Sequence, residues 1–240
     1  MAGRAILKKE VIAEIGQNHN GDMVIAKELI YAAKEAGANV AKFQLYDAKR
    51  LFERKNNDWY EYNCKTELSY SQVQELAEIC EKVEIEFMAS VFDRIRIGWL
   101  EEVGVKRYKL ASRSIQEKSL IKEIVNKGKP ILVSLGMWDK KEFPQIEAKN
   151  RVDFLYCVSK YPTELTDLKL LGVDFAKYAG FSDHTIGVEA AMIALSRGAR
   201  ILEKHFTLDK KMYGPDHLGS MTPSELSQIT RFCDALEAAL

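Results

Sequence analysis

Short apolar runs alternate with amphipathic segments from one end of the chain to the other. Compact apolar runs are typical of buried parallel strands, whereas apolar positions that recur with the helical period are typical of helices. The pattern predicts strands over residues 11–16, 40–46, 85–91, 107–112, 130–136, 152–159, 178–184 and 200–206. It predicts helices over residues 23–36, 71–82, 94–103, 118–127, 140–149, 165–172, 188–196 and 223–240.

Residues that favour helix ends support these boundaries. Ser71 and Asp139 are candidate N-caps, and Thr222 followed by Pro223 matches a cap with proline at the first helical position. Glycine serves as a C-cap because it adopts the left-handed conformation without strain. Five glycines fall at or just after the predicted helix ends: Gly37, Gly104, Gly128, Gly172 and Gly198.

Eight strand–helix units with no remainder favour a closed (β/α)8 TIM barrel, an α/β fold for which 240 residues is an ordinary length. An open, doubly wound sheet is the alternative, but no Gly-x-Gly-x-x-Gly motif follows the first strand. Nothing suggests a second domain, so we expect one barrel domain over residues 1–240.

The connection between the second strand and its helix, residues 47–70, is unusually long. It is rich in charged and aromatic residues, including Trp59, Tyr60 and Tyr62. Loops of this length are lids, binding loops or disordered segments. The aromatic side chains either close over a substrate or pack on the barrel, and the sequence leaves both open.

Composition excludes several classes of partner. The chain is 47% hydrophobic, and its 35 basic and 35 acidic residues give a formal net charge of zero. We therefore expect neither nucleic acid nor an anionic membrane as a partner. Any anion site must arise from a local arrangement of basic side chains.

The cysteines and the N-terminus indicate a reducing compartment. Cys64, Cys80, Cys157 and Cys233 show no Cys-x-x-Cys spacing and are interpreted as reduced thiols. The N-terminus has no apolar signal region. No apolar run reaches the roughly 18 residues that a membrane-spanning helix needs. We expect a soluble, cytoplasmic protein.

Polar residues occupy the strand ends where a barrel forms its active site. They include two lysines inside apolar runs and several hydroxyls, which are the donors that a phosphate or carboxylate needs. We therefore predict a small anion site. The strand residues are Glu14, Lys42, Gln44, Ser90, Lys109, Ser112, Ser134, Ser159, Ser182, Asp183, His184, Glu203 and His205.

His184 and His205 end two consecutive predicted strands, so their side chains should converge. Histidine is the commonest ligand of transition metals, and the pair predicts a metal site with open positions. His184 alone would more often be a structural histidine. His19 and His217 lie in loops and are each more simply explained as exposed residues.

Other residues also have a structural alternative. Glu14 is either a functional carboxylate or a barrel-core carboxylate paired with Lys42. Each serine, taken singly, is more often structural than functional. Tyr161 and Pro162, which follow the sixth strand, are either part of the site or only a turn.

Longer motifs extend over almost the entire chain. They are residues 12–21, 41–44, 108–112, 135–137, 157–163, 180–187, 203–209 and 214–217. In these stretches the chain resembles the sialic acid synthases, a family that includes N-acetylneuraminate synthase and its legionaminic and pseudaminic acid relatives. No single motif is specific, but together they are.

The resemblance implies a TIM barrel that condenses phosphoenolpyruvate with an N-acylated hexosamine such as N-acetylmannosamine. A divalent metal, Mn²⁺ or Mg²⁺, would bind to His184 and His205 and polarise the open-chain aldehyde. Carbon 3 of the enol would attack the aldehyde, water would add at carbon 2, and phosphate would leave with C–O cleavage. The family also implies a homodimer.

The resemblance assigns a role to each motif position. Glu14 would contact the sugar and is a candidate for proton transfer, and Gln44, Tyr161 and Asp216 would orient the sugar. The remaining positions would bind phosphoenolpyruvate: Lys42, Ser90, Lys109, Ser112, Ser134, Ser159 and Ser182. Two other functions compete with this one, namely a synthase that uses another free or phosphorylated aldose, and a barrel that binds a sugar or a protein without turnover.

The chain departs from the family pattern in three places. Arg113 and Ser114 stand where the family commonly carries a glutamate that contacts the sugar, Ser159 replaces a common asparagine, and Glu117 replaces another. The small antifreeze-like domain that family members append is not expected in residues 1–240. This indicates a fragment or a barrel-only enzyme with altered sugar recognition, which Arg113 would help to compensate.

Overall fold

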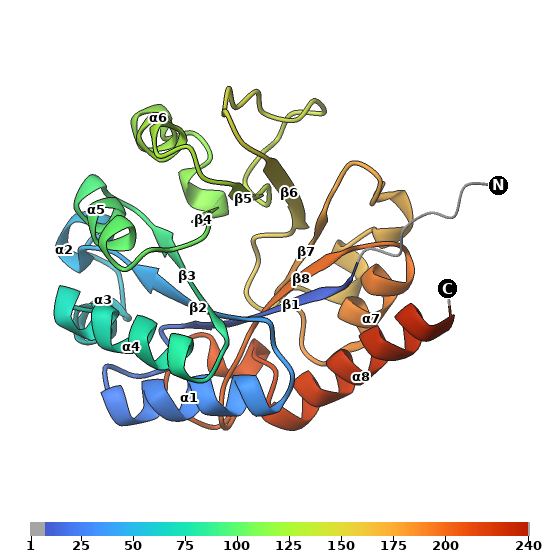
Figure 1. Cartoon of the computed structure of the whole chain (residues 1–240), viewed down its shortest axis with the longest axis horizontal. Coiled ribbons are helices and arrows are strands. Elements are labelled where there is room, and N and C mark those ends of the chain that lie inside the picture. Colours follow the sequence, from blue (N-terminus) through green and yellow to red (C-terminus); the bar gives the residue numbers. More distant parts are fainter. Residues whose placement is uncertain (1–7, 240) are drawn as a thin grey trace.

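The computed structural model describes residues 8–239 and shows eight parallel strands closed into a barrel in chain order (Figure 1). The strands are β1 (Glu10–Gly16), β2 (Val40–Leu45), β3 (Glu86–Val91), β4 (Tyr108–Leu110), β5 (Ile131–Ser134), β6 (Val152–Cys157), β7 (Gly180–Asp183) and β8 (Ile201–His205). The predicted TIM barrel is therefore confirmed, with every strand at its predicted place, and the open sheet is excluded.

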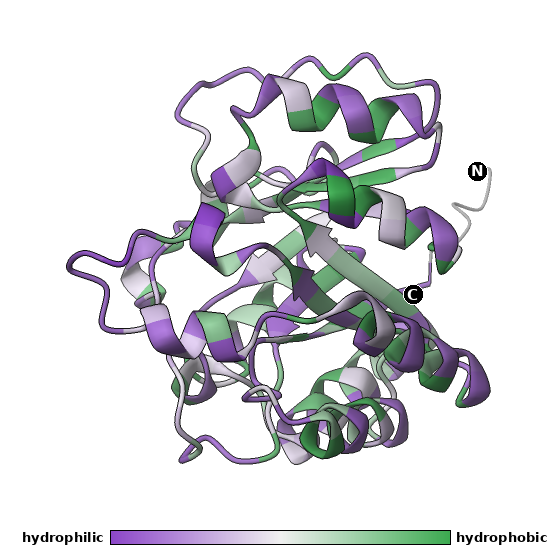
Figure 2. Cartoon of the chain, turned by 90° about the vertical axis from the view of Figure 1, so that its left-hand side faces the viewer, coloured by the Kyte–Doolittle hydropathy of each residue, from purple (hydrophilic) through white to green (hydrophobic). Residues whose placement is uncertain are grey.

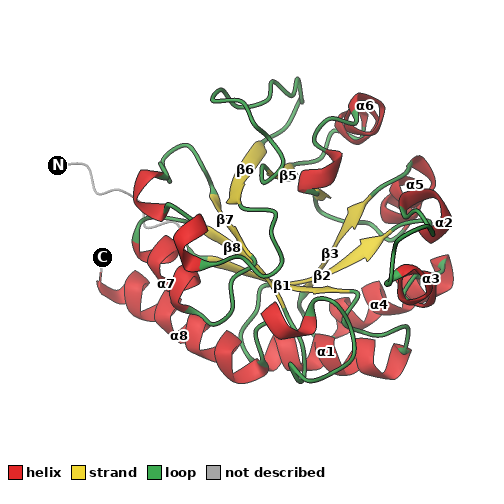
Figure 3. Cartoon of the chain, turned by 180° about the vertical axis from the view of Figure 1, so that it is seen from behind, coloured by secondary structure: helices red, strands yellow, loops and turns green. Residues whose placement is uncertain are grey.

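Helices cover the outside of the barrel, as Figures 1 and 3 show. They are α1 (Met23–Glu35), α2 (Ala48–Leu51), α3 (Tyr60–Lys65), α4 (Tyr70–Lys82), α5 (Arg94–Glu102), α6 (Lys118–Asn126), α7 (Glu189–Ser196) and α8 (Pro223–Ala239). Short 3₁₀ turns add η1 (Ser112–Ser114), η2 (Leu165–Asp167), η3 (Leu170–Gly172) and η4 (His217–Gly219).

Two predicted helices are wrong. Residues 140–149 form an irregular segment between β5 and β6, which appears as a loop in Figure 3. Pro144 lies in the middle of this stretch, and proline removes a helical hydrogen bond and disfavours the helical conformation of the residue before it. Asp139 is therefore not an N-cap. Residues 165–172 form only η2 and η3, separated by Lys169 in the left-handed conformation at φ 46°.

The helix caps are close to prediction. Helix α4 begins after Ser69 rather than Ser71, and the Ser69 and Gln72 side chains form a reciprocal capping box. Four of the five predicted C-cap glycines have positive φ, whereas Gly172 closes η3 instead.

The long connection is docked on the barrel rather than free above it. It contains α2 and α3, and the Gln17 amide donates to Asn63 Oδ1 at 3.0 Å. The Tyr62 hydroxyl donates to Asn20 Oδ1 at 2.7 Å, and His217 Nε2 lies 3.1 Å from the same oxygen. Tyr62 and Trp59 pack against Tyr213. These aromatic residues therefore pack on the loops that follow β1 and β8.

The barrel interior is divided into an apolar layer and a polar layer. Side chains of a strand alternate between its faces, so residues two apart share the interior. Ile12 is followed two positions later by Glu14, Val40 by Lys42, and Ile201 by Glu203 and then His205. The apolar layer lies toward the strand starts and consists of Ile12, Val40, Met88, Leu132, Leu155, Ala179 and Ile201.

A larger apolar core fills the space between the outer face of the strands and the helices. Figure 2 shows apolar strands and helices that mix apolar and polar residues, as amphipathic helices on a barrel require. All four cysteines are free thiols, as predicted. Within residues 8–239, no helix combines the length and the apolar character needed to cross a bilayer.

Gly180 marks a close approach between β7 and β8. A Cβ atom there would lie 1.8 Å from the backbone oxygen of Ile201 on the neighbouring strand. Gly180→Ala should therefore lower the free energy of unfolding by about 1–3 kcal/mol or more, because the strands must separate. Gly98→Ala in α5 is the matched control, since nothing lies within 4 Å of its added methyl. Urea denaturation that finds equal stability for both variants would contradict this account of the barrel.

Candidate active site

The C-terminal ends of the strands enclose a cavity of about 70 Å³. Most of the predicted site residues line it: Glu14, Lys42, Gln44, Ser90, Lys109, Ser112, Ser134, Tyr161, Ser182, His184 and His205. Ser159 is absent from the lining, but its hydroxyl is buried without a partner among the described residues. Asp216 lines a neighbouring cavity. The structure thus brings the predicted residues together at one end of the barrel.

Two lysines and two glutamates form a buried charge cluster in this cavity. Lys42 Nζ lies 2.6 Å from Glu14 Oε2 and 3.4 Å from Glu203 Oε2. Lys109 Nζ lies 3.5 Å from Glu203 Oε1. All four side chains are almost fully buried. Buried charges are tolerated only when they are paired, and here two positive charges balance two negative ones.

The contacts of Glu14 agree both with a functional carboxylate and with a barrel-core carboxylate. Glu14 is paired with Lys42, as the structural alternative requires, and its other oxygen accepts a hydrogen bond from Gln44 at 2.9 Å. Both partners line the cavity. The pairing is therefore compatible with either interpretation.

Glu203 is the centre of the cluster, whereas the sequence indicated only that it lies with other polar residues at the end of a strand. Burial would raise the pKa of its carboxyl, but the ammonium groups of Lys109 and Lys42 and the Ser182 hydroxyl hold the pKa down to about 2. Ser182 donates to Glu203 Oε1 at 2.8 Å. Glu203 lies two residues before His205 on the same face of β8, and this spacing in the sequence indicates that the Glu203 side chain points into the barrel.

The two lysines differ in how firmly they hold their protons. Burial would lower the pKa of Lys42, but Glu14 and Glu203 raise it above its ordinary value. Burial lowers the pKa of Lys109, and Lys42 lowers it further, while Glu203 opposes both. Lys109 is therefore the ammonium group that gains most from an additional anion nearby.

Serine hydroxyls fix the lysines in place. Lys42 donates to Ser90 Oγ at 3.1 Å, and Lys109 donates to Ser134 Oγ at 2.8 Å. Ser112 Oγ accepts a hydrogen bond from the Gly136 amide at 3.0 Å. These donors face one small cavity, so the arrangement can hold a phosphate or carboxylate group.

His184 and His205 lie together at the cavity, with ring centroids 5.8 Å apart. His184 Nδ1 donates to the Val158 carbonyl at 3.0 Å, which fixes the ring in the way typical of metal-binding histidines. His205 Nδ1 is buried without a hydrogen-bond partner, and the nearest carboxylate oxygen, on Asp216, is 3.9 Å away.

These two imidazoles fit a divalent cation with two protein ligands. Among the described residues, no three His, Cys, Asp or Glu side chains gather to hold a metal ion. The other coordination positions would therefore come from water or from substrate oxygens, as in catalytic rather than structural sites.

A second cavity of about 50 Å³ adjoins the first and shares Tyr161, His184 and His205 with it. It is lined further by Pro162, Pro215, Asp216, Leu218 and Gly219. Tyr161 and Asp216, the predicted sugar-orienting residues, thus lie where the two cavities meet and in the outer one.

The remaining histidines do not join the site. His19 and His217 are buried rather than exposed, contrary to prediction. Burial lowers the pKa of His19 to about 4. His217 contacts Thr207 Oγ1 through Nδ1 at 2.7 Å and Asn20 through Nε2, so it pins the loop after β8 to the loop after β1. Short sequence motifs give no signal of such contacts.

The structure also places Cys157 and Arg113 beside the cavity. Cys157 lines the cavity, with Sγ 3.8 Å from His184 Nδ1. Arg113 lies over the rings of Phe52 and Phe92, at 5.4 and 5.9 Å, and donates to the Leu51 carbonyl. It therefore anchors α2 beside the cavity wall.

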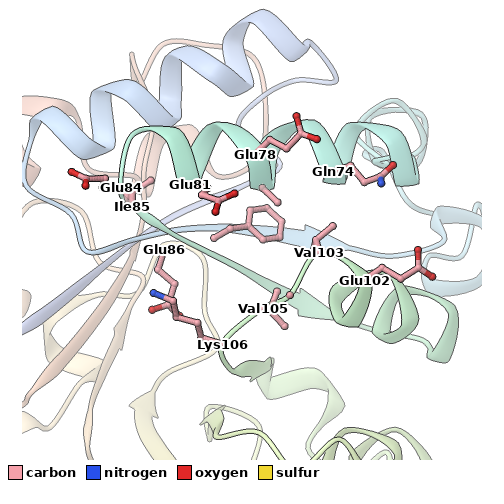
Figure 4. Close-up of a pocket in the computed structure, with 13 residues that line it drawn as sticks. Gln74, Glu78, Glu81, Glu84, Ile85, Glu86, Glu102, Val103, Val105 and Lys106 are labelled. Carbon is pink, nitrogen blue, oxygen red and sulfur yellow. The ribbon is translucent and has the colours of Figure 1, made fainter.

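A larger cavity, of about 590 Å³, lies between α4, β3 and α5, away from this cluster (Figure 4). Glutamates surround it, including Glu78, Glu81, Glu84 and Glu102. It contains no histidine and only one basic side chain, Lys106. Chemistry rather than volume therefore identifies the strand-end cavity as the candidate active site.

Several known proteins are similar to this chain in sequence and in fold. The model of the NeuB family matches residues 29–240. The N,N'-diacetyllegionaminic acid synthase of Legionella pneumophila is 36% identical over 96% of this chain and 72% of its own length. The N-acetylneuraminate-9-phosphate synthase of Homo sapiens is 34% identical over 96% of this chain and 70% of its own. The N-acetylneuraminic acid synthetase of Leptospira borgpetersenii superposes with a TM-score of 0.89 at 30% identity, covering 97% of this chain and 85% of that one.

Removing the Glu203 carboxylate should destabilise the protein in a pH-dependent way. At pH 7, Glu203→Gln should lower the free energy of unfolding by about 3 kcal/mol, because two buried ammonium groups lose a partner. The pKa of Glu203 is depressed from 4.5 to about 2, so its contribution is complete above pH 4.5 and is lost as the pH falls toward 2. The deficit of the variant should therefore shrink at pH 3.

Urea denaturation at both pH values measures this difference. Glu61→Gln is the control, because Glu61 forms an exposed ion pair with Arg54 that should contribute little. A Glu203→Gln deficit that is absent, or that is the same at pH 7 and pH 3, would contradict the charge-cluster account.

Proposed function

The chain belongs to the NeuB family and is a sialic acid-type synthase, and on that premise we propose that it condenses phosphoenolpyruvate with an N-acylated hexosamine and releases phosphate. N-acetylmannosamine is the simplest such acceptor, and the product would be a 2-keto-3-deoxy nonulosonic acid. The observation that carries the proposal is the cavity in which Lys42 and Lys109 adjoin two imidazoles.

The lysine–serine cluster supports the phosphoenolpyruvate half of the reaction. Lys42 and Lys109 bind the phosphate and carboxylate of the substrate, and the Ser90 and Ser134 hydroxyls that already contact them keep the ammonium groups in place. Ser112, Ser159 and Ser182 supply further hydroxyl donors. An incoming anion also raises the pKa of Lys109, which burial otherwise lowers.

The histidine pair supports the acceptor half. A divalent cation, Mn²⁺ or Mg²⁺, on His184 and His205 would polarise the acceptor's aldehyde as a Lewis acid. Val158 holds the His184 ring through Nδ1. Tyr161, whose ring centroid is 4.2 Å from that of His184, restricts access of water and orients the sugar together with Gln44 and Asp216.

Glu14 is suited to proton transfer. Its Oε2 atom lies 2.6 Å from Lys42 Nζ, and both residues line the cavity, so the pair is within reach of the aldehyde oxygen, which takes up a proton. That oxygen becomes a hydroxyl as carbon 3 of the enol bonds to the aldehyde carbon. Water then adds at carbon 2, and phosphate leaves with cleavage of its C–O bond.

Arg113 favours a phosphorylated aldose as the second candidate acceptor. Among the described residues, no carboxylate lies within ion-pair distance of its guanidinium, which donates to the Leu51 carbonyl beside the cavity wall. An anionic group on the acceptor would provide the missing partner. We give this second place because Arg113 also has a structural role in anchoring α2. A non-catalytic barrel is disfavoured, since both lysines and both histidines are in place.

Three further properties stay predictions. A homodimer follows from the family resemblance, and a cytoplasmic location follows from composition and free cysteines. A single barrel domain over residues 1–240 is the third.

Phosphate release tests the proposed function directly. The full chain should release phosphate from phosphoenolpyruvate when Mn²⁺ and an N-acylated hexosamine are both present, and mass spectrometry should find the condensation product. His205→Ala should abolish release while circular dichroism stays unchanged, because the substitution removes a metal ligand rather than core packing. Full release in the presence of a chelator would contradict the metal assignment, and release without any acceptor would contradict the condensation.

Removal of the Lys109 ammonium group should weaken phosphoenolpyruvate binding. Lys109→Met should raise the Kd measured by calorimetry by about ten- to a hundredfold, since a hydrogen bond to a charged group contributes roughly 1.5–3 kcal/mol. Lys160→Met is the control, because Lys160 follows β6 but pairs with Asp167 outside the cavity. Equal Kd values for the two variants would place the anion site elsewhere.

A further inference from the structure

A second pair of buried charges lies next to the two strand-end histidines. Lys204 Nζ donates to Asp183 Oδ2 at 2.9 Å, and the two side chains are 1% and 0% exposed. Asp183 directly precedes His184 at the end of β7, and Lys204 directly precedes His205 in β8. A buried ion pair is often no more stabilising than apolar residues of the same volume. Its place beside both histidines therefore suggests a role other than stability.

This ion pair lies on the opposite face of the strands from the histidine side chains. Both of its residues border the strand-end cavity, but the side chains of a strand alternate between its faces. The residues just before them, Ser182 and Glu203, meet inside the barrel at 2.8 Å. The residues before those, Phe181 and Leu202, belong to the apolar core under the helices. The pair thus shares the outer face with that core and acts on the histidines through the backbone.

The ion pair also lies where the ladder between β7 and β8 ends. Asp183 and Lys204 are the last paired positions of these two strands. Lys204 Nζ donates further to the Thr185 carbonyl, and Asp183 Oδ1 accepts hydrogen bonds from the Thr185 amide at 2.9 Å and hydroxyl at 2.8 Å. Because Thr185 follows His184, this network holds the chain on both sides of that histidine.

The backbone position is important for a cation with only two protein ligands, and this step rests on the proposed function. The His184 ring is fixed by the Val158 carbonyl through Nδ1. The His205 ring has no such hydrogen bond, since its Nδ1 atom is buried without a partner among the described residues. The distance between the two imidazoles therefore depends on how the ends of β7 and β8 are joined.

We infer that Lys204, Asp183 and Thr185 are positioning residues that set the distance between His184 and His205, and thereby the affinity for a divalent cation. The ion pair joins the two strand ends where the ladder no longer does. None of the three residues binds the cation or the substrates. Groups that orient metal ligands in this way typically change metal affinity by about ten- to a hundredfold when they are removed.

Binding of Mn²⁺ alone to the full chain tests this inference, with the free ion measured by electron paramagnetic resonance. The double variant Asp183→Asn, Lys204→Met removes both charges together, so neither is left unpaired, and asparagine keeps an oxygen for Thr185. It should raise the Kd of Mn²⁺ by about ten- to a hundredfold. The Kd of phosphoenolpyruvate without metal should stay unchanged, because Lys42 and Lys109 keep their own serine partners.

The ion pair between Arg107 and Glu86 provides the matched control. It joins β3 and β4 at their starts, with Nε 2.8 Å from Oε1, and both side chains are mostly buried. The double variant Glu86→Gln, Arg107→Met should lower the melting temperature but leave the Kd of Mn²⁺ unchanged. A Kd of Mn²⁺ in the Asp183→Asn, Lys204→Met variant equal to that of the unaltered protein would overturn the positioning role.

A milder substitution tests the same network if the double variant does not fold. Thr185→Val removes only the hydroxyl that donates to Asp183. It should raise the Kd of Mn²⁺ by a smaller factor, about threefold, since one hydrogen bond is lost. Thr185→Ser keeps the hydroxyl and should bind Mn²⁺ as the unaltered protein does. Equal Kd values for the valine and serine variants would contradict the inference.

The outcomes separate this inference from the proposed function. Failure of the unaltered protein to bind Mn²⁺ would overturn the proposed metal site, and the positioning role with it. Binding of Mn²⁺ that is equally strong in the unaltered protein and in all variants would keep the metal site and overturn only the positioning role. Weakened Mn²⁺ binding in the variants, without phosphate release from any acceptor by the unaltered protein, would support the positioning role and overturn the synthase.

Discussion

Two lysines buried inside the barrel need two buried carboxylates, and the site depends on this balance. Lys42 and Lys109 contact Glu14 and Glu203, and all four side chains are almost fully buried. An unpaired charge there would cost several kcal/mol, so the cluster is stable only as a set. Under the proposed function, the same set would attract an anionic substrate, because the lysines line the cavity. That substrate would then compete with Glu203 for the ammonium groups.

The division of the barrel interior into an apolar layer and a polar layer determines where this charge cluster lies. Toward the strand starts, seven apolar side chains fill the interior. Two residues further along β1, β2 and β8 the interior positions become charged, and along β3 and β5 they become serines. The apolar layer closes the barrel and supplies a rigid floor, and the polar layer stays at the C-terminal end, where loops bring in Tyr161 and Asp216. The long connection packs against the loops after β1 and β8, because Tyr62 and His217 share Asn20 as a hydrogen-bond partner.

Much of this arrangement could be predicted from the sequence. Strand positions follow from short apolar runs, and alternation along each strand correctly predicts that Lys42, Gln44 and His205 face the interior. The predictions that failed concern features that depend on contacts between distant residues or on competing local preferences. Residues 140–149 have a helical period, but Pro144 prevents the helix. The burial of His19 and His217 and the central place of Glu203 arise from partners far away in the chain, which a pattern does not contain.

The central claim is that the polar layer at the strand ends binds both substrates side by side. A crystal structure of the protein with phosphoenolpyruvate and Mn²⁺ tests it most directly. The account predicts the anionic groups of phosphoenolpyruvate within hydrogen-bond distance of Lys42 and Lys109, and the ion on His184 and His205 beside them. Electron density for phosphoenolpyruvate outside this cavity, with the Lys42–Glu14 and Lys109–Glu203 contacts undisturbed, would contradict it.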